Sequence, residues 1–145
     1  MEALLFVYAK DLKKLKEEIL SYDNEDKLFK IAEGITNSAG NLAMHLTGNL
    51  RYFIGALLGK TGYIRNREEE FSGRFSKDKI VADIEETIAV LQTTLRSISP
   101  EDLTKTYPEK VGGNEMTTEL FLYYLLSHLN YHLGQINYHR RLTNK

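Results

Sequence analysis

The sequence predicts an all-α protein, a four-helix bundle with a long crossover between its second and third helices. Two observations carry this prediction. Apolar residues recur every three or four positions in four separate segments, which is the period of an amphipathic helix. Signals for strands are weak throughout, and the sequence contains no internal repeat. A length of 145 residues suits one buried core, so we expect residues 1–145 to form a single domain.

The first helix is expected over residues 2–20, with a solvated face of lysines and glutamates opposite its apolar stripe. That stripe consists of Leu5, Tyr8, Leu12, Leu15 and Ile19. Residues 21–37 are expected to connect it to the second helix, which begins at Asn37 or Ser38, both good N-caps, and ends near Gly59. The stripe of the second helix consists of Leu42, Leu46, Leu50, Phe53 and Leu57.

Glycines at positions 59, 62 and 73 indicate a long connection after the second helix. It is long enough to cross the bundle, so a plain up-down-up-down order is not required. The third helix is expected over about 76–98, and the Ser99-Pro100 pair predicts one short helical turn after it. Residues 104–116 indicate an irregular segment or a small hairpin, and the last helix is expected from Thr117 to Leu142.

Composition excludes several classes of protein. The formal net charge is −1, which provides no basic excess for phosphate contacts, so no nucleic-acid partner is expected. The absence of cysteine excludes disulfides, a cysteine zinc site and a cysteine nucleophile, and it suits a reducing compartment. The apolar run Ala3 to Tyr8 is too short for a signal peptide, and Leu120 to Tyr138 is too polar to cross a bilayer. We therefore expect a cytoplasmic protein without a membrane segment.

Two of the four histidines, His128 and His132, are spaced i and i+4 on the last helix. One helical turn places them on the same face, about 6 Å apart along the axis. Two imidazoles in that arrangement can converge on one ion, and imidazole suits zinc, nickel, copper or iron(II). The surrounding helix is uncharged and rich in leucine, as a metal pocket in a bundle core requires. The alternative is two hydrogen-bonded core histidines.

His45 lies midway along the second helix, where Arg51 is the one charged residue between Ser38 and Gly59. A helix so poor in charge is expected to be buried over most of its circumference. His45 can then complete a three-nitrogen site, or it can be an ordinary core histidine. His139 lies roughly 10 Å beyond His132 along the helix axis, next to two arginines, and is expected to be a surface residue.

Three polar residues are candidates to line a pocket beside these histidines. Gln135 lies three positions after His132, and Asn49 and Tyr52 share the face of His45. The alternative is that they are polar groups in helix packing. No carboxylate is expected in the pocket as a general base. Neither Glu-x-x-His nor His-Glu-x-x-His occurs, which argues against di-iron carboxylate bundles and zincin proteases.

The run Ser127-His128-Leu129-Asn130-Tyr131-His132-Leu133-Gly134-Gln135-Ile136, preceded by Asn41-Leu42-Ala43-Met44-His45-Leu46, resembles the DinB/YfiT-like superfamily of metalloenzymes. The resemblance covers essentially the whole chain. It implies a four-helix bundle with unusual connectivity, frequent homodimers, and a site for zinc or nickel whose three ligand positions are filled here by His45, His128 and His132. Characterised members are thiol-dependent transferases or isomerases that use a low-molecular-weight thiol. Residues 37–42 resemble a branch whose members mostly lack an assigned function.

These observations lead to a principal hypothesis about function and an alternative. The principal hypothesis is a divalent-metal-dependent enzyme, a thiol-dependent transferase or a hydrolase acting on a small molecule, because three nitrogens leave a tetrahedral zinc with an open position. Without cysteine in the chain, any thiol must come from outside. The alternative is a non-catalytic helical dimer that binds a metal or another ligand. A homodimer is expected in both cases, because the second and fourth helices carry so little charge.

Overall fold

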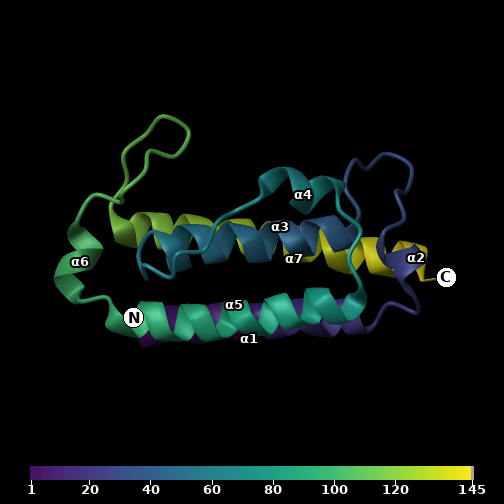
Figure 1. Cartoon of the computed structure of the whole chain (residues 1–145), viewed down its shortest axis with the longest axis horizontal. Helices are drawn as coiled ribbons and strands as arrows, with labels where there is room; N and C mark the ends of the chain where they lie inside the picture. Colours follow the sequence, from purple (N-terminus) through teal and green to yellow (C-terminus); the bar gives the residue numbers. More distant parts are fainter. Residues whose placement is uncertain (145) are drawn as a thin grey trace.

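Four long helical segments lie side by side in the structure, a computed structural model that describes residues 1–144 (Figure 1). They are α1 (Glu2–Leu20), α3 (Ala39–Leu50) with its continuation η1 (Arg51–Ala56), α5 (Lys77–Ser97) and α7 (Thr118–Thr143). Three short helices occur in the connections: α2 (Glu25–Leu28), α4 (Arg67–Ser72) and α6 (Pro100–Thr104). The all-helical fold that the periodicity predicts is thereby confirmed.

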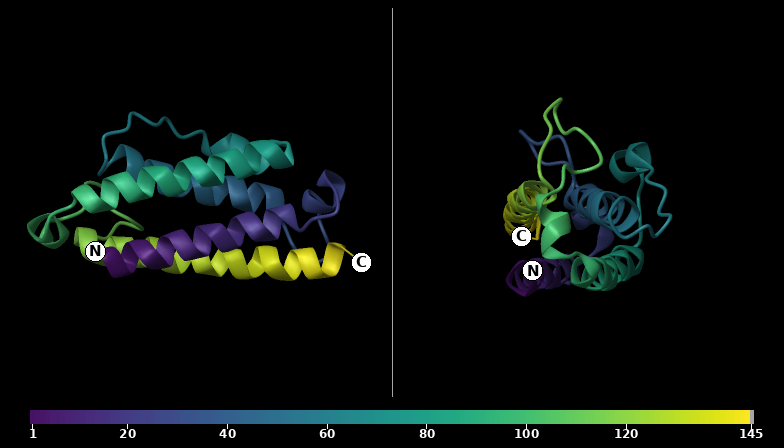
Figure 2. Two further views of the ribbon diagram at one scale, coloured as in Figure 1. Left: turned by 90° about the horizontal axis from the view of Figure 1, so that it is seen from below. Right: turned by 90° about the vertical axis from the view of Figure 1, so that its left-hand side faces the viewer.

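The order of the helices around the bundle differs from their order along the chain. α1 packs against α5 and α7, and α3 packs against the same two helices, so α1 and α3 lie largely diagonal to each other. α3 and α5 run in the same direction, because the chain after η1 returns along the outside of the bundle before α5 begins (Figures 1 and 2). This return is the predicted long crossover, and it carries α4 across the surface of α3.

Side-chain caps fix where the long helices begin, and they explain why most predicted boundaries agree with the structure. Ser38, Ser76 and Thr117 each accept a hydrogen bond from the backbone N–H three residues later. Ser99 forms a reciprocal capping box with Asp102, with Pro100 at the first helical position. Residues 104–116 form the small reversal expected, with one bridge between Thr106 and Thr117 and another at its tip.

The second helix departs from the predicted pattern in its last turn. Residues 51–56 form a π-helix, in which hydrogen bonds span five residues instead of four. Side chains after Leu50 are therefore rotated relative to an α-helical register. Two short helices are present that the sequence does not predict, α2 within residues 21–37 and α4 within the crossover.

One apolar core runs along the bundle between the four long segments. Tyr8, Leu12, Leu46, Ile84 and Leu129 are examples of its fully buried members. The buried Tyr8 hydroxyl has a partner within this core, because it donates to the carbonyl of Leu122 over 2.6 Å. Within residues 1–144, no helix combines the length and apolar character that crossing a bilayer requires.

Candidate metal centre

Three histidines from two helices meet between α3 and α7. The Nε2 atom of His128 lies 3.3 Å from Nε2 of His45 and 3.1 Å from Nε2 of His132. Each of the three residues offers a ring nitrogen within 4.8 Å of those of the other two. The rings meet edge to face, with angles between 77° and 89° for the three pairs. The three residues that the sequence singles out are thus brought together, and they form a group that can hold a metal ion.

The spacing of these nitrogens fits a transition-metal ion. Zinc binds imidazole nitrogens at about 2.0–2.1 Å in tetrahedral geometry, which places two ligand nitrogens about 3.3 Å apart. The two Nε2 separations of 3.1 and 3.3 Å match that value. Three neutral imidazoles are also the donor set that zinc, nickel and copper accept.

The rings of His128 and His132 are held in their neutral form at neutral pH. Burial, together with the proximity of His132, His45 and Arg65, lowers the pKa of His128 to about 4. Burial also lowers the pKa of His132, against a hydrogen bond to Gln135 that raises it. Each of these two neutral rings therefore has a lone pair available for a metal ion at neutral pH.

The buried carboxylate of Glu70, on α4, contacts the ring nitrogen of His45 that is farther from the other two histidines. Its Oε2 lies 3.1 Å from Nδ1 of His45, and Nη2 of Arg65 lies 3.3 Å from the same nitrogen. We assign the proton to Nδ1, because the contact with the carboxylate is the shorter one and this Arg65 nitrogen already donates to Glu70. Arg65 donates to both oxygens of Glu70, over 2.7 and 2.8 Å. The lone pair of His45 is then on Nε2, the nitrogen that faces the other two histidines. This tautomer is the one that metal binding through Nε2 requires.

Burial on its own would raise the pKa of the Glu70 carboxyl. The hydrogen bonds from Arg65 and His45, together with the positive charge of Arg65, outweigh burial and lower the pKa below its usual value. Glu70 therefore remains ionised at neutral pH, as an acceptor for His45 must.

Two features of α3 position this carboxylate: one binds the crossover and the other leaves space for the side chain. Asn41 of α3 donates from Nδ2 to the carbonyls of Glu70 and Gly73, which fastens α4 to α3. At Gly48, a Cβ atom would lie 2.1 Å from Oε1 of Glu70, so the absence of a side chain there makes room for the carboxylate. Glu70 does not contradict the expectation that no carboxylate serves as a general base, because His45 and Arg65 already occupy it. Its role as the partner of His45 is nevertheless not predicted from the sequence. The signal available was Asn66 followed by Glu69, a helix-start pattern inside the crossover.

A cleft of about 270 Å³ adjoins the triad on the side of His45 and His128. Its walls are largely aromatic and its rim carries two arginines. The lining beyond the two histidines includes Asn49, Phe53, Arg65, Arg67, Phe121 and Tyr124. A small molecule in this cleft would lie against the edges of two of the three rings.

The three residues expected to line the pocket have different positions. Asn49 lines the cleft, and its side-chain oxygen is buried without a hydrogen-bond partner. Gln135 accepts a hydrogen bond at Oε1 from Nδ1 of His132 over 2.7 Å, so it holds His132 as Glu70 holds His45. Tyr52 is not part of the lining, and its hydroxyl donates to Glu109 over 2.6 Å. The π-helical turn explains this difference, because it presents Phe53 to the cleft instead.

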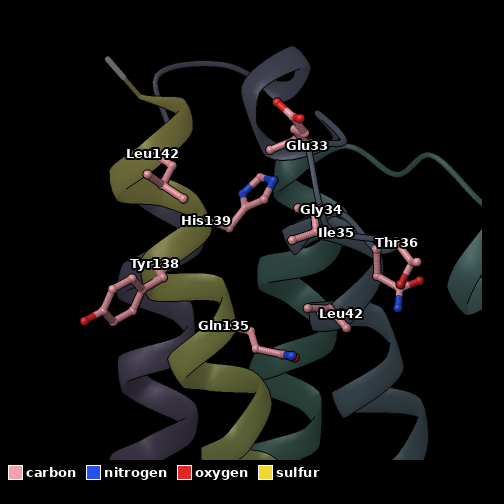
Figure 3. A pocket seen from close by; sticks show the side chains of 11 residues that line it. Glu33, Gly34, Ile35, Thr36, Leu42, Gln135, Tyr138, His139 and Leu142 are labelled. Atoms are coloured by element: carbon pink, nitrogen blue, oxygen red, sulfur yellow. The ribbon is translucent and has the colours of Figure 1, made fainter.

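His139 is buried, and the prediction that it is a surface residue is wrong. Only 6% of it is exposed. Its Nδ1 lies 2.7 Å from the hydroxyl of Tyr22, and its Nε2 lies 2.7 Å from the carbonyl of Lys30. The segment after α2 covers this end of α7, and together they enclose a second cavity of about 340 Å³ (Figure 3). Gln135 and His139 both line that cavity.

Comparison with known proteins identifies a solved structure with a similar fold and a family that matches the sequence. A DinB-like protein from Bacillus cereus ATCC 10987, known from its crystal structure, superposes with a TM-score of 0.73. The superposition covers 98% of this chain and 91% of that one at 19% identity, which establishes a shared DinB-like fold. No curated protein of known function matches the sequence. A family model described as a protein of unknown function, DUF1572, matches residues 5–145, and the chain therefore belongs to this family.

Proposed function

We propose that this protein binds one divalent transition-metal ion through His45, His128 and His132 and uses it to act on a small molecule. The convergence of three Nε2 atoms beside an open cleft is the observation that carries the proposal. The spacing and the nitrogen donor set favour zinc or nickel. A structural zinc site is normally closed by four protein ligands, whereas three ligands beside a cleft are typical of a catalytic site.

A bound ion of this kind supplies Lewis acidity, which makes water or an external thiol a better nucleophile at neutral pH. The chain itself orients its histidines through Glu70 and Gln135, and it offers a substrate the aromatic wall of Phe53 and Phe121. Glu70 is already bound to Arg65 and His45, so it is not free to accept a proton from a substrate. This favours thiol transfer, with a low-molecular-weight thiol from outside, over a hydrolysis that needs a protein base.

We also propose that two copies of the chain form a homodimer through α7. Large apolar side chains form an exposed stripe along that helix, with 50–66% of each accessible. The stripe consists of Leu120, Tyr124, Tyr131, Tyr138 and Leu142. Apolar surface gathered along one helix favours burial against another protein surface. The ring of Tyr131 in this stripe packs edge to face with the ring of His132, so a dimer formed here would lie close to the metal centre.

The test of the metal site is elemental analysis of protein purified without a histidine tag. We expect about one zinc or nickel ion per chain, and a content near zero for His45→Ala and His132→Ala with helical circular dichroism retained. His139→Gln is the matched control, because it removes an imidazole outside the triad. Unchanged metal content in both triad variants would show that the ligand assignment is wrong.

Catalysis is tested separately, by assaying metal-loaded protein with small thiols and electrophiles. Turnover that disappears in His132→Ala is the expected result. Metal binding without turnover for any thiol or hydrolysable ester would instead support the non-catalytic alternative.

A further inference from the structure

Two buried side-chain atoms in residues 1–144 have no hydrogen-bond partner, and both belong to the cleft beside the histidines. They are Nδ1 of His128 and Oδ1 of Asn49. A buried polar group without a partner costs roughly 1–3 kcal/mol, so such atoms need an explanation. One of the two is a ring nitrogen that can carry a proton and donate it in a hydrogen bond, and the other is an amide oxygen that can accept a hydrogen bond.

The other two histidines of the triad show what is missing at His128. Nδ1 of His45 donates to Glu70, and Nδ1 of His132 donates to Gln135. In metal sites, the ring nitrogen that faces away from the ion is commonly held by an acceptor, which fixes the tautomer and strengthens the ligand. His128 alone has no such acceptor in this structure.

Asn49 is in the right place to supply it. It lies one helical turn after His45 on α3, and the Nε2 atoms of His45 and His128 are 3.3 Å apart across the α3–α7 interface. Only 7% of Asn49 is exposed, and it lines the same cleft as His128.

We propose that Asn49 is the positioning residue for His128, accepting a hydrogen bond at Oδ1 from Nδ1–H of His128 when the site holds its metal ion. This inference rests on the proposed metal site. The two atoms are not bonded to each other in this structure, so the bond requires a side-chain adjustment on metal binding. With it, each of the three histidines has its own acceptor: Glu70, Asn49 and Gln135.

The amide also suits the metal-free protein. There, Nε2 of His128 faces two other Nε2 lone pairs, so the proton of His128 belongs on Nε2 and Nδ1 becomes an acceptor. Rotation of the Asn49 amide by 180° then presents its NH2 group in place of its oxygen. An asparagine can serve both states of His128, whereas a carboxylate can serve only the metal-bound state.

The experiment measures zinc affinity by competition with a chromophoric chelator at pH 7.5, for wild type and three variants. Asn49→Leu keeps the size and removes the acceptor, and we expect zinc binding about 10–100-fold weaker. Asn49→Asp keeps an acceptor, and we expect it to bind zinc at least as tightly as wild type. Thr47→Val, which removes a buried hydroxyl from the same helix, is the control and should leave affinity unchanged.

Nitrogen-15 NMR of the histidine rings provides a second readout that a merely structural role would not change. In zinc-loaded wild type we expect Nδ1 of His128 to carry a slowly exchanging proton, and in Asn49→Leu we expect that exchange to be fast. A wild-type zinc affinity in Asn49→Leu would overturn the proposed role of Asn49, and so would equal losses of zinc affinity in the Leu and Asp variants. Either result would leave the proposed metal site intact. Absence of zinc binding by wild type would overturn the metal site as well.

Discussion

At the scale of single residues, the candidate site depends on which nitrogen of each histidine carries the proton. Glu70 decides this for His45 and Gln135 decides it for His132. Neither partner is a metal ligand, yet each fixes a lone pair toward the centre of the triad. The site therefore extends beyond the three histidines to their hydrogen-bond partners, one of which, Glu70, lies on a helix that is not predicted from the sequence.

The role of Glu70 can be tested by substitution. Glu70→Gln removes the charge that holds the proton on Nδ1 of His45, so we expect zinc affinity to fall by about 10–100-fold. Isothermal titration calorimetry with zinc measures the loss. Glu69→Gln is the matched control, because Glu69 is the exposed neighbour on the same short helix. An affinity equal to wild type in Glu70→Gln would mean that Arg65 and the surrounding packing orient His45 without it.

A substitution at His139 is expected to have the opposite effect, lowering the stability of the fold and leaving metal binding unchanged. His139→Ala removes the two hydrogen bonds of this imidazole, to Tyr22 and to Lys30, so we expect a loss of about 2 kcal/mol in the free energy of unfolding. Urea denaturation measures this loss, and metal content should remain at the wild-type value. A loss of metal together with normal stability would place His139 in the site.

At the scale of helices, α1 and α7 are joined by a buried polar contact as well as by the apolar core. Glu18 is 2% exposed, and it accepts hydrogen bonds from Arg140 over 2.6 Å and from Asn137 over 2.8 Å. Burial would raise the pKa of Glu18, but these hydrogen bonds and the nearby positive charges lower it below its usual value. A group with a lowered pKa stabilises the fold when it is ionised.

The sign of the pH dependence follows from that shift. Above the unfolded-state pKa, near 4.5, the ionised Glu18 contributes its full stabilisation, and this is lost as the pH falls through its lower folded-state value. We expect Glu18→Gln to lower the melting temperature at pH 7 and to reduce the further loss between pH 5 and pH 3. Differential scanning calorimetry at these pH values checks this. An unchanged acid dependence in the variant would assign the effect to other carboxylates.

At the scale of the whole molecule, the exposed apolar stripe of α7 is the surface that we propose to form the homodimer. A helix of 26 residues is about 39 Å long, enough to form one side of a dimer interface. We expect wild type to sediment as a dimer at micromolar concentration in analytical ultracentrifugation, and Tyr138→Arg to shift it to monomer. Phe6→Arg, an equally exposed aromatic side chain on α1, is the control and should remain dimeric. A monomeric wild type would remove the dimer proposal.

The features that depend on residues close together in the chain could be predicted from the sequence. The periods of leucine and isoleucine predict the four long helices, and capping residues such as Ser38 and Thr117 predict where they begin. The spacing of His128 and His132 places them on one face whatever the rest of the chain does. The family resemblance then implies that His45 is the third metal ligand.

Tertiary structure alone decided the rest, because it depends on contacts between residues far apart in the chain. Glu70 reaches His45 only because the crossover folds α4 onto α3, where Gly48 leaves space for it. His139 is buried by Tyr22 and Lys30, more than 100 positions away. A sequence period reports which side of a helix is apolar, but it cannot report which distant segment covers that side. The sequence therefore determined the helices and the candidate ligands, and the fold determined which acceptors hold those ligands in place.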